Sequence, residues 1–194
     1  MPSSVARLVG LDHDRLIRLL KKACKIGPNQ DRWRNEFTAL LRAHRVAERA
    51  ELLDEVGRTL PDLAAAASAQ EQDDRGFDRV ADHVAEAAID DAAFADLCSG
   101  AQQAVFAHGE ALRATVLDPL GQVVGRKEMR RLGGRYEARR DEQLRASHLH
   151  PPPPRRLDVT RAELYELAKR AGIEGRSGMS RDELIIELQR RQDH

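Results

Sequence analysis

The chain has 194 residues, with 32 Lys or Arg against 32 Asp or Glu, so its formal net charge is zero. Aromatic residues are only 4% of the total, and the apolar residues are largely Ala and Leu, which favours helices over a sheet. Two cysteines without a Cys-x-x-Cys motif exclude a disulfide scaffold and a thiolate zinc site. No apolar run reaches the ~20 residues of a membrane span, and the first residues lack a secretory signal pattern. We therefore expect a soluble, cytoplasmic protein with no membrane partner.

Helical periodicity predicts four amphipathic helices in the first part of the chain. Apolar residues recur at helical spacing over about 4–25, 30–56, 72–89 and 92–117. Pro61 and an Ala-rich stretch follow the second helix, and Pro119 is expected to close the fourth. Four such helices joined by short breaks favour an all-α fold, an up-down four-helix bundle.

A fifth, strongly charged helix is predicted over about 121–147, with a thin apolar stripe of Leu132, Tyr136 and Leu144. The next segment contains four consecutive prolines, which cannot continue a helix and favour an extended spacer. The predicted domains are therefore a body of residues 1–147, a Pro-rich linker of 148–156 and a tail of 157–194.

The tail contains two capping boxes, in which a hydroxyl residue is followed three residues later by Glu. Thr160 with Glu163 opens one helix, and Ser180 with Glu183 opens another. The tail is therefore predicted to be a small helix-loop-helix domain.

Histidines fall one on each predicted helix of the body: His13, His44, His83 and His108. Helical spacing places each on an apolar face, so all four are expected to point inward. Glu48 lies one turn after His44 on the same face. Imidazoles and carboxylates from facing helices are the usual ligands for iron or manganese inside a bundle. The alternative for each histidine is a hydrogen-bonded core residue, and four of them beside a buried carboxylate favour a metal site.

Three further carboxylates lie near these histidines. Glu86, three residues after His83, is an additional candidate ligand, whereas Glu51 and Glu55 are expected to be solvated residues at the flank of the second helix.

Over roughly residues 5–145 the pattern resembles the hemerythrin-like (HHE cation-binding) family. The motifs that carry the resemblance are Asp12-His13-Asp14, His44-Arg-Val-Ala-Glu48, Asp82-His83, His108 ahead of Val-Leu-Asp-Pro119, and Leu132-Gly-Gly-Arg-Tyr136. The resemblance implies a four-helix bundle around a non-haem di-iron site. The implied iron ligands are His13, His44, Glu48, His83 and His108.

The sequence departs from the family at its last ligand. The family has a carboxylate four or five residues after the final histidine, where this chain has Leu112 and Arg113. Glu110 is only two residues from His108 and projects to another side of the helix. A di-iron site would then be completed by water, be reduced to a single metal, or have been lost.

Residues 157–191 resemble the small N-terminal domain of the transcription terminator Rho, which is similar to the SAP module. The specific part is the loop Gly172-Ile-Glu-Gly175-Arg-Ser-Gly-Met179-Ser. The resemblance implies contact with DNA or RNA through Lys169, Arg170, Arg176 and Arg181. The connector, residues 121–156, has ten basic against four acidic residues and is a second candidate phosphate-binding surface, although such a helix can equally be a solvated face.

These observations together predict a non-haem iron protein, with a di-iron centre as the expected form and one or two ions per chain. Its expected role is oxygen or redox sensing, O2 binding or oxidative-stress defence rather than dedicated catalysis, with O2, peroxide or nitric oxide as the small partner. Two alternatives stay open: a nucleic-acid-associated protein whose bundle is a scaffold with a degraded metal site, and an oxidoreductase that consumes peroxide or O2.

Overall fold

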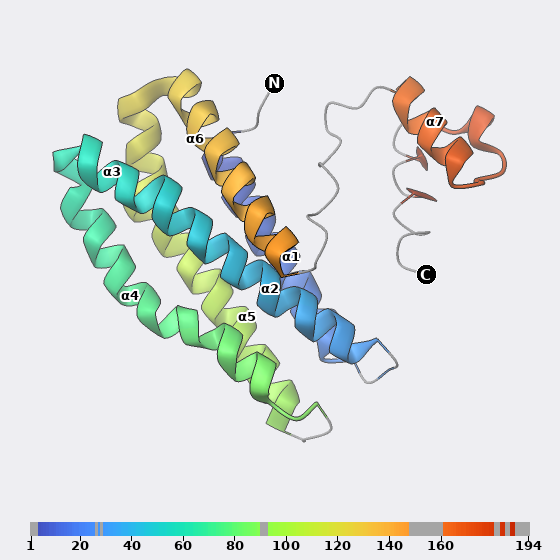
Figure 1. Ribbon diagram of the computed structural model, residues 1–194, viewed down its shortest axis with the longest axis horizontal. Coiled ribbons are helices and arrows are strands. Elements are labelled where there is room, and N and C mark those ends of the chain that lie inside the picture. Colours follow the sequence, from blue (N-terminus) through green and yellow to red (C-terminus); the bar gives the residue numbers. More distant parts are fainter. Residues whose placement is uncertain are drawn as a thin grey trace. The chain divides into compact units, whose positions relative to one another are not determined.

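The computed structural model describes residues 4–25, 27, 29–89, 93–147, 161–180, 183, 184, 187 and 188 (Figure 1). Within these ranges all regular secondary structure is helical, as the composition predicts. No helix of the described residues is long and apolar enough to cross a membrane. The chain divides into two compact units, Pro2–Pro151 and a smaller one that contains Pro152–His194. This division falls inside the predicted linker, which itself lies outside the described residues.

The first two predicted helices form close to their expected positions. Helix α1 (Val5–Ala23) begins at Ser4, whose hydroxyl accepts a hydrogen bond from the backbone N–H of Arg7 at 3.4 Å. Helix α2 (Gln30–Glu48) continues without a break into the π-helix η1 (Arg49–Leu53). The short helix α3 (Asp54–Thr59) then completes the segment that was predicted to form one helix over 30–56.

Pro61 follows the second predicted helix, as expected, and also begins the next helix. Helix α4 (Pro61–Glu86) starts well before the predicted residue 72. Proline is tolerated in a first turn because its missing N–H would have no helical partner there, and the Ala-rich residues that follow have high helix propensity.

The prediction that Pro119 closes the fourth helix is wrong. Helix α5 (Ala93–Leu112) leads through the π-helix η2 (Arg113–Leu117) into α6 (Asp118–Ala146), and Pro119 lies in the first turn of α6. The chain changes direction instead at Gly125, whose φ of 72° is a conformation that glycine adopts without strain.

Helices α1, α2, α4 and α5 form a closed ring of packed neighbours, since α1 contacts α2, α2 contacts α4, α4 contacts α5, and α5 contacts α1 (Figure 1). Helix α6 lies against both α1 and α2. Its predicted apolar stripe of Leu132, Tyr136 and Leu144 is buried there, so the connector helix is part of the body.

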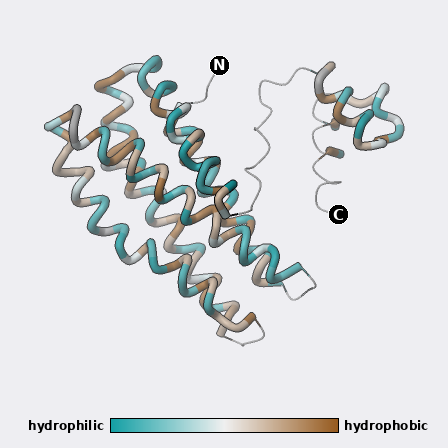
Figure 2. The backbone as a smooth tube through the Cα atoms, in the orientation of Figure 1, coloured by the Kyte–Doolittle hydropathy of each residue, from teal (hydrophilic) through white to brown (hydrophobic). Residues whose placement is uncertain are grey.

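The core of the body consists of two apolar clusters with a polar layer between them. Apolar residues recur along each helix (Figure 2), and on α1 one cluster ends at Val9 and the other begins at Leu16. Every long helix places buried polar residues between the two clusters: Asp12 and His13 on α1, His44, Arg45 and Glu48 on α2, Gln70 and Asp74 on α4, His108 on α5, and Arg140 on α6. A polar layer at one level of five helices indicates a built site, because isolated buried polar groups are costly.

In the smaller unit, α7 (Arg161–Arg170) forms as predicted. The core of this smaller unit consists of Leu164, Ala168, Ile173 and Leu184. The capping box at Ser180 is confirmed: the backbone N–H of Glu183 donates to the Ser180 hydroxyl at 3.3 Å, and the Ser180 N–H donates to the Glu183 carboxylate at 2.7 Å. Thr160, of the other predicted box, lies outside the described residues.

Candidate metal centre

Three of the predicted histidines meet around Glu48 in the polar layer. The Nε2 atoms of His13 and His44 are 3.1 Å apart. Oxygen Oε2 of Glu48 lies 3.2 Å from Nε2 of His44 and 3.2 Å from Nε2 of His108. All four residues are buried, and one nitrogen from each histidine lies within 4.8 Å of the others, which is close enough for one ion to bind all three.

His83 does not join this group. It is exposed on α4, as is Glu86, so the expectation that all four histidines point inward is wrong for His83. The buried face of α4 includes Phe77 and Val84. Since His83 directly precedes Val84, its side chain projects about 100° away from that face.

Asp74 is the residue that α4 contributes instead, and sequence reasoning missed it. Glu48, Asp74 and His108 form a second group whose ligand atoms lie within 4.8 Å of one another. The available signal was its spacing, three residues before Phe77 and seven before Ala81, which places it on the buried face. It was overlooked although it lies inside the predicted helix 72–89, because candidate ligands on this helix were sought only at and after His83.

Hydrogen bonds at the Nδ1 atoms orient two of the imidazoles. His108 donates from Nδ1 to the Asp74 carboxylate at 2.6 Å. The Tyr136 hydroxyl donates to Asp12 at 2.7 Å, so its oxygen accepts the hydrogen bond from Nδ1 of His44, at 2.6 Å. Both arrangements direct Nε2 toward Glu48, as partners of metal-binding histidines do.

Helix α6, which lies outside the ring of α1, α2, α4 and α5, helps to hold the His44 imidazole in this orientation. Arg140 donates from one guanidinium nitrogen to Asp12 at 2.9 Å, beside the bond from Tyr136. Although burial opposes it, hydrogen bonding with His44 and the charge of Arg140 hold the pKa of Asp12 below its usual value. Burial and the neighbouring Asp12 raise the pKa of Tyr136 well above its usual value, so the phenol stays a hydrogen-bond donor.

The histidines differ in their protonation. Burial, with the nearby His44 and His108, lowers the pKa of His13 to about 2, so its imidazole is neutral and ready to bind a cation. Burial also acts to lower the pKa of His108, but the hydrogen bond with Asp74 and the neighbouring charge of Glu48 outweigh it and raise the value to about 9. A metal ion would therefore displace a proton from His108.

Several buried atoms of the centre lack hydrogen bonds. Both carboxylate oxygens of Glu48, Nε2 of His108 and Oδ2 of Asp74 make no well-aligned hydrogen bond in the part of the chain that the structure describes, although Arg45 lies at ion-pair distance from Oε2 of Glu48 and from Oδ2 of Asp74. Unsatisfied buried polar groups are rare in native proteins and costly, by about 1–3 kcal/mol each and more when charged. An imidazole and carboxylate donor set left open in this way fits a metal ion.

The outer carboxylates and the connector arginines pair with one another. Glu51 accepts a hydrogen bond from Arg135 at 2.6 Å, and Glu55 lies 3.3 Å from both Arg131 and Arg135. These glutamates therefore bind α6 to the body. The candidate phosphate surface on the connector is correspondingly reduced.

The tail places two of its candidate nucleic-acid residues on the surface. Lys169 and Arg170 are exposed, whereas Arg176 is half-buried and donates to the backbone oxygen of Ile173 at 2.8 Å. Arg181 lies outside the described residues, as do His148 and His150 beside the prolines.

Comparison with known proteins gives no relative for this chain. No protein-family model, no curated protein and no solved structure matches it. The proposal for its function therefore depends on the chemistry of its own residues.

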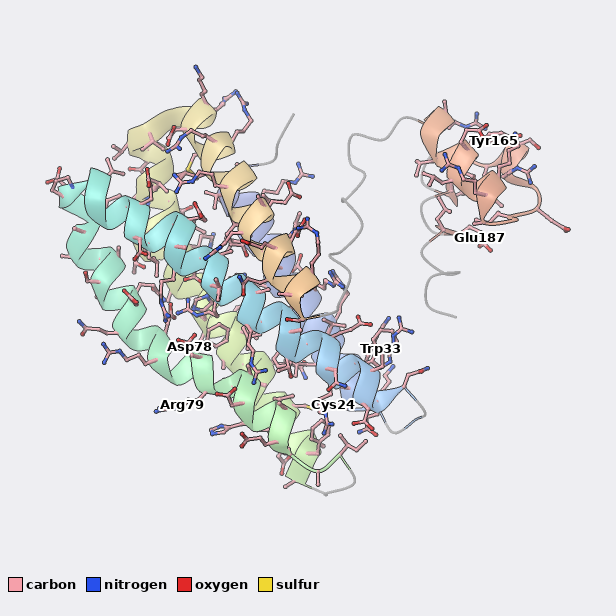
Figure 3. The ribbon with its side chains drawn as sticks, in the orientation of Figure 1. Cys24, Trp33, Asp78, Arg79, Tyr165 and Glu187 are labelled. Carbon is pink, nitrogen blue, oxygen red and sulfur yellow. The ribbon has the colours of Figure 1, made fainter. Side chains whose placement is uncertain are left out.

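Replacing Tyr136 by Phe is expected to destabilise the protein by about 1–3 kcal/mol, because Nδ1 of the buried His44 loses its acceptor. The same change should weaken metal binding about 10–100-fold, since the His44 ring is then less well oriented. Urea denaturation and a zinc titration measure the two effects. Tyr165→Phe, in the other unit (labelled in Figure 3), is the matched control. Equal metal affinity in both variants would contradict the assigned role of Tyr136.

Proposed function

We propose that the body binds non-haem iron in a hemerythrin-like four-helix bundle and acts in oxygen or redox sensing, O2 binding or oxidative-stress defence. The observation that carries this proposal is the convergence of His13, His44 and His108 at a distance that one ion could bridge, with the buried Glu48 3.2 Å from Nε2 of both His44 and His108. A buried cluster of imidazoles and carboxylates is costly in a core that binds no cation.

The donor set supports iron or manganese over calcium and magnesium. Mixed imidazole and carboxylate ligands suit iron or manganese, whereas calcium and magnesium prefer oxygen alone and no thiolate lies in the set. Iron would supply redox chemistry and an open coordination position, at which O2, peroxide or nitric oxide is the expected small partner.

The chain's own residues hold and insulate this position. His13, His44, His108 and Glu48 are the proposed ligands. Asp74 and Tyr136 fix the rings of His108 and His44 through their Nδ1 atoms. The apolar clusters on both sides of the polar layer exclude bulk water, which strengthens electrostatic interactions inside the site.

Iron content after anaerobic loading with ferrous iron and desalting tests the proposal. The wild-type chain should retain iron, and the double variant His44→Ala/Glu48→Ala should retain none. His83→Ala is the matched control, because His83 is an exposed histidine of the same body, and this variant should retain as much iron as the wild type. A wild-type chain that retains no iron would refute the proposal.

A further inference from the structure

The centre offers two overlapping places for a cation. One lies among the three histidines, His13, His44 and His108, and the other lies among Glu48, Asp74 and His108. A two-metal centre would use both places, which have His108 in common. The question is therefore whether the second place is open to an ion.

A positive charge of the chain already occupies the second place. One terminal guanidinium nitrogen of Arg45 lies 2.7 Å from Oε2 of Glu48 and 2.9 Å from Oδ2 of Asp74. A metal ion would bind these oxygens at about 2.0–2.2 Å and would collide with that nitrogen. Since arginine does not lose its proton in proteins, it cannot give way by becoming neutral.

Arg45 is also held in position from its other side. Its Nε donates to Asp78 of α4 at 2.7 Å, and Asp78 (labelled in Figure 3) also accepts a hydrogen bond from Arg49 at 3.1 Å. Only 6% of the Arg45 side chain is exposed, and its guanidinium lies 5.9 Å from the centre of the Phe77 ring. To leave the second place, the Arg45 guanidinium would have to break its hydrogen bond to Asp78 and lose its ion pairs with Glu48 and Asp74.

We propose that Arg45 takes the place of a second metal ion and restricts the centre to one ion per chain, bound by His13, His44, His108 and Glu48. This inference rests on the proposed metal-binding function and specifies its nuclearity. Asp74 is then a positioning residue that holds His108 and Arg45 and does not bind the ion. A single iron would supply one electron per chain between its ferrous and ferric states, which favours sensing over two-electron reduction of O2.

The number of ions per chain tests this inference in the full-length protein. Elemental analysis after ferrous loading and calorimetric titration with Zn²⁺, a redox-silent probe, should each give one ion per wild-type chain. Asp74→Asn should also bind one ion, with lower affinity. Arg45→Gln, which frees Glu48 and Asp74, should bind two ions, while the matched variant Arg42→Gln should bind one.

The outcomes separate this inference from the proposed function. Two ions per wild-type chain, or a fall from two to one in Asp74→Asn, would overturn the inference and leave metal binding intact. Arg45→Gln that folds and binds only one ion would also overturn it. No ion in the wild type would overturn the proposed function itself. Should Arg45→Gln fail to fold, the wild-type and Asp74→Asn values still decide between one ion and two.

Discussion

Replacing Arg45 by Met is expected to lower the free energy of unfolding of the metal-free protein by about 3–5 kcal/mol, the cost of removing one partner of a buried ion pair. Glu48 is 0% exposed and Asp74 only 2%, and both lie within ion-pair distance of Arg45. Although burial opposes it, the contacts with His108 and His44 and the charge of Arg45 hold the pKa of Glu48 well below its usual value. Without Arg45, the two buried carboxylates lose a cation that they share.

Arg42→Met is the matched control for this prediction, because Arg42 lies one turn earlier on α2. Its ion pair with Asp82 is exposed on both sides, with 58% and 53% of the side chains accessible, and should contribute less than about 1 kcal/mol. Urea denaturation of the two variants measures the difference. Equal losses of stability would show that the buried charges do not depend on Arg45.

Replacing Gly109 by Ala is expected to weaken metal binding at least about 100-fold, because it displaces a ligand and not merely the partner of one. A Cβ at this position would lie 2.6 Å from Nδ1 of His13, so the imidazole would have to move out of the centre. Alanine favours a helix over glycine by about 1 kcal/mol, so α5 itself should persist. Zinc titration and circular dichroism measure these two effects.

Gly100→Ala provides the comparison for Gly109→Ala on the same helix. None of the neighbouring atoms in the described residues lies within 4 Å of a Cβ built at Gly100, so this variant should keep full metal affinity. Unchanged affinity in Gly109→Ala would mean that His13 is not a ligand.

The sequence predicts the helices and most of the centre for one physical reason, which is that helical spacing reports the buried face directly. His13, His44, Glu48 and His108 lie on the apolar stripes of their helices, and the structure brings them together. His83 was misplaced because it lies three residues after Val80, which suggested that both residues share the buried face of the helix. The residue that lies on this face is instead Val84, the next in the chain.

The remaining residues of the centre could not be predicted from spacing alone. Tyr136 was recognised as part of an apolar stripe and of the Leu132–Tyr136 motif, with no role in the centre, because its hydroxyl finds its partners on α1 and α2, which are distant in sequence. Arg45 directly follows His44, and helical spacing places it at the flank of the apolar stripe of α2. Its long side chain nevertheless reaches Asp74, on another helix, and this contact depends on how α2 and α4 pack.

In the tail, the loop glycines and the second capping box agree with the sequence pattern, because capping is a local interaction. Gly172 and Gly175 adopt φ values of 64° and 71°, and Ser180 pairs with Glu183 as predicted. The nucleic-acid roles of Lys169 and Arg170 stay predictions.

If the proposed ion binds, the position of the polar layer between the two apolar clusters would link the supply of metal to the cellular half-life of the protein. Every long helix of the body crosses this layer, so an ion bound there joins both halves of the core. An ion that binds only the folded chain stabilises it by about 2.7 kcal/mol when its free concentration is 100 times the dissociation constant. Proteases degrade the unfolded chain, and the cellular half-life of this protein would therefore lengthen in iron-replete cells and shorten in starved ones.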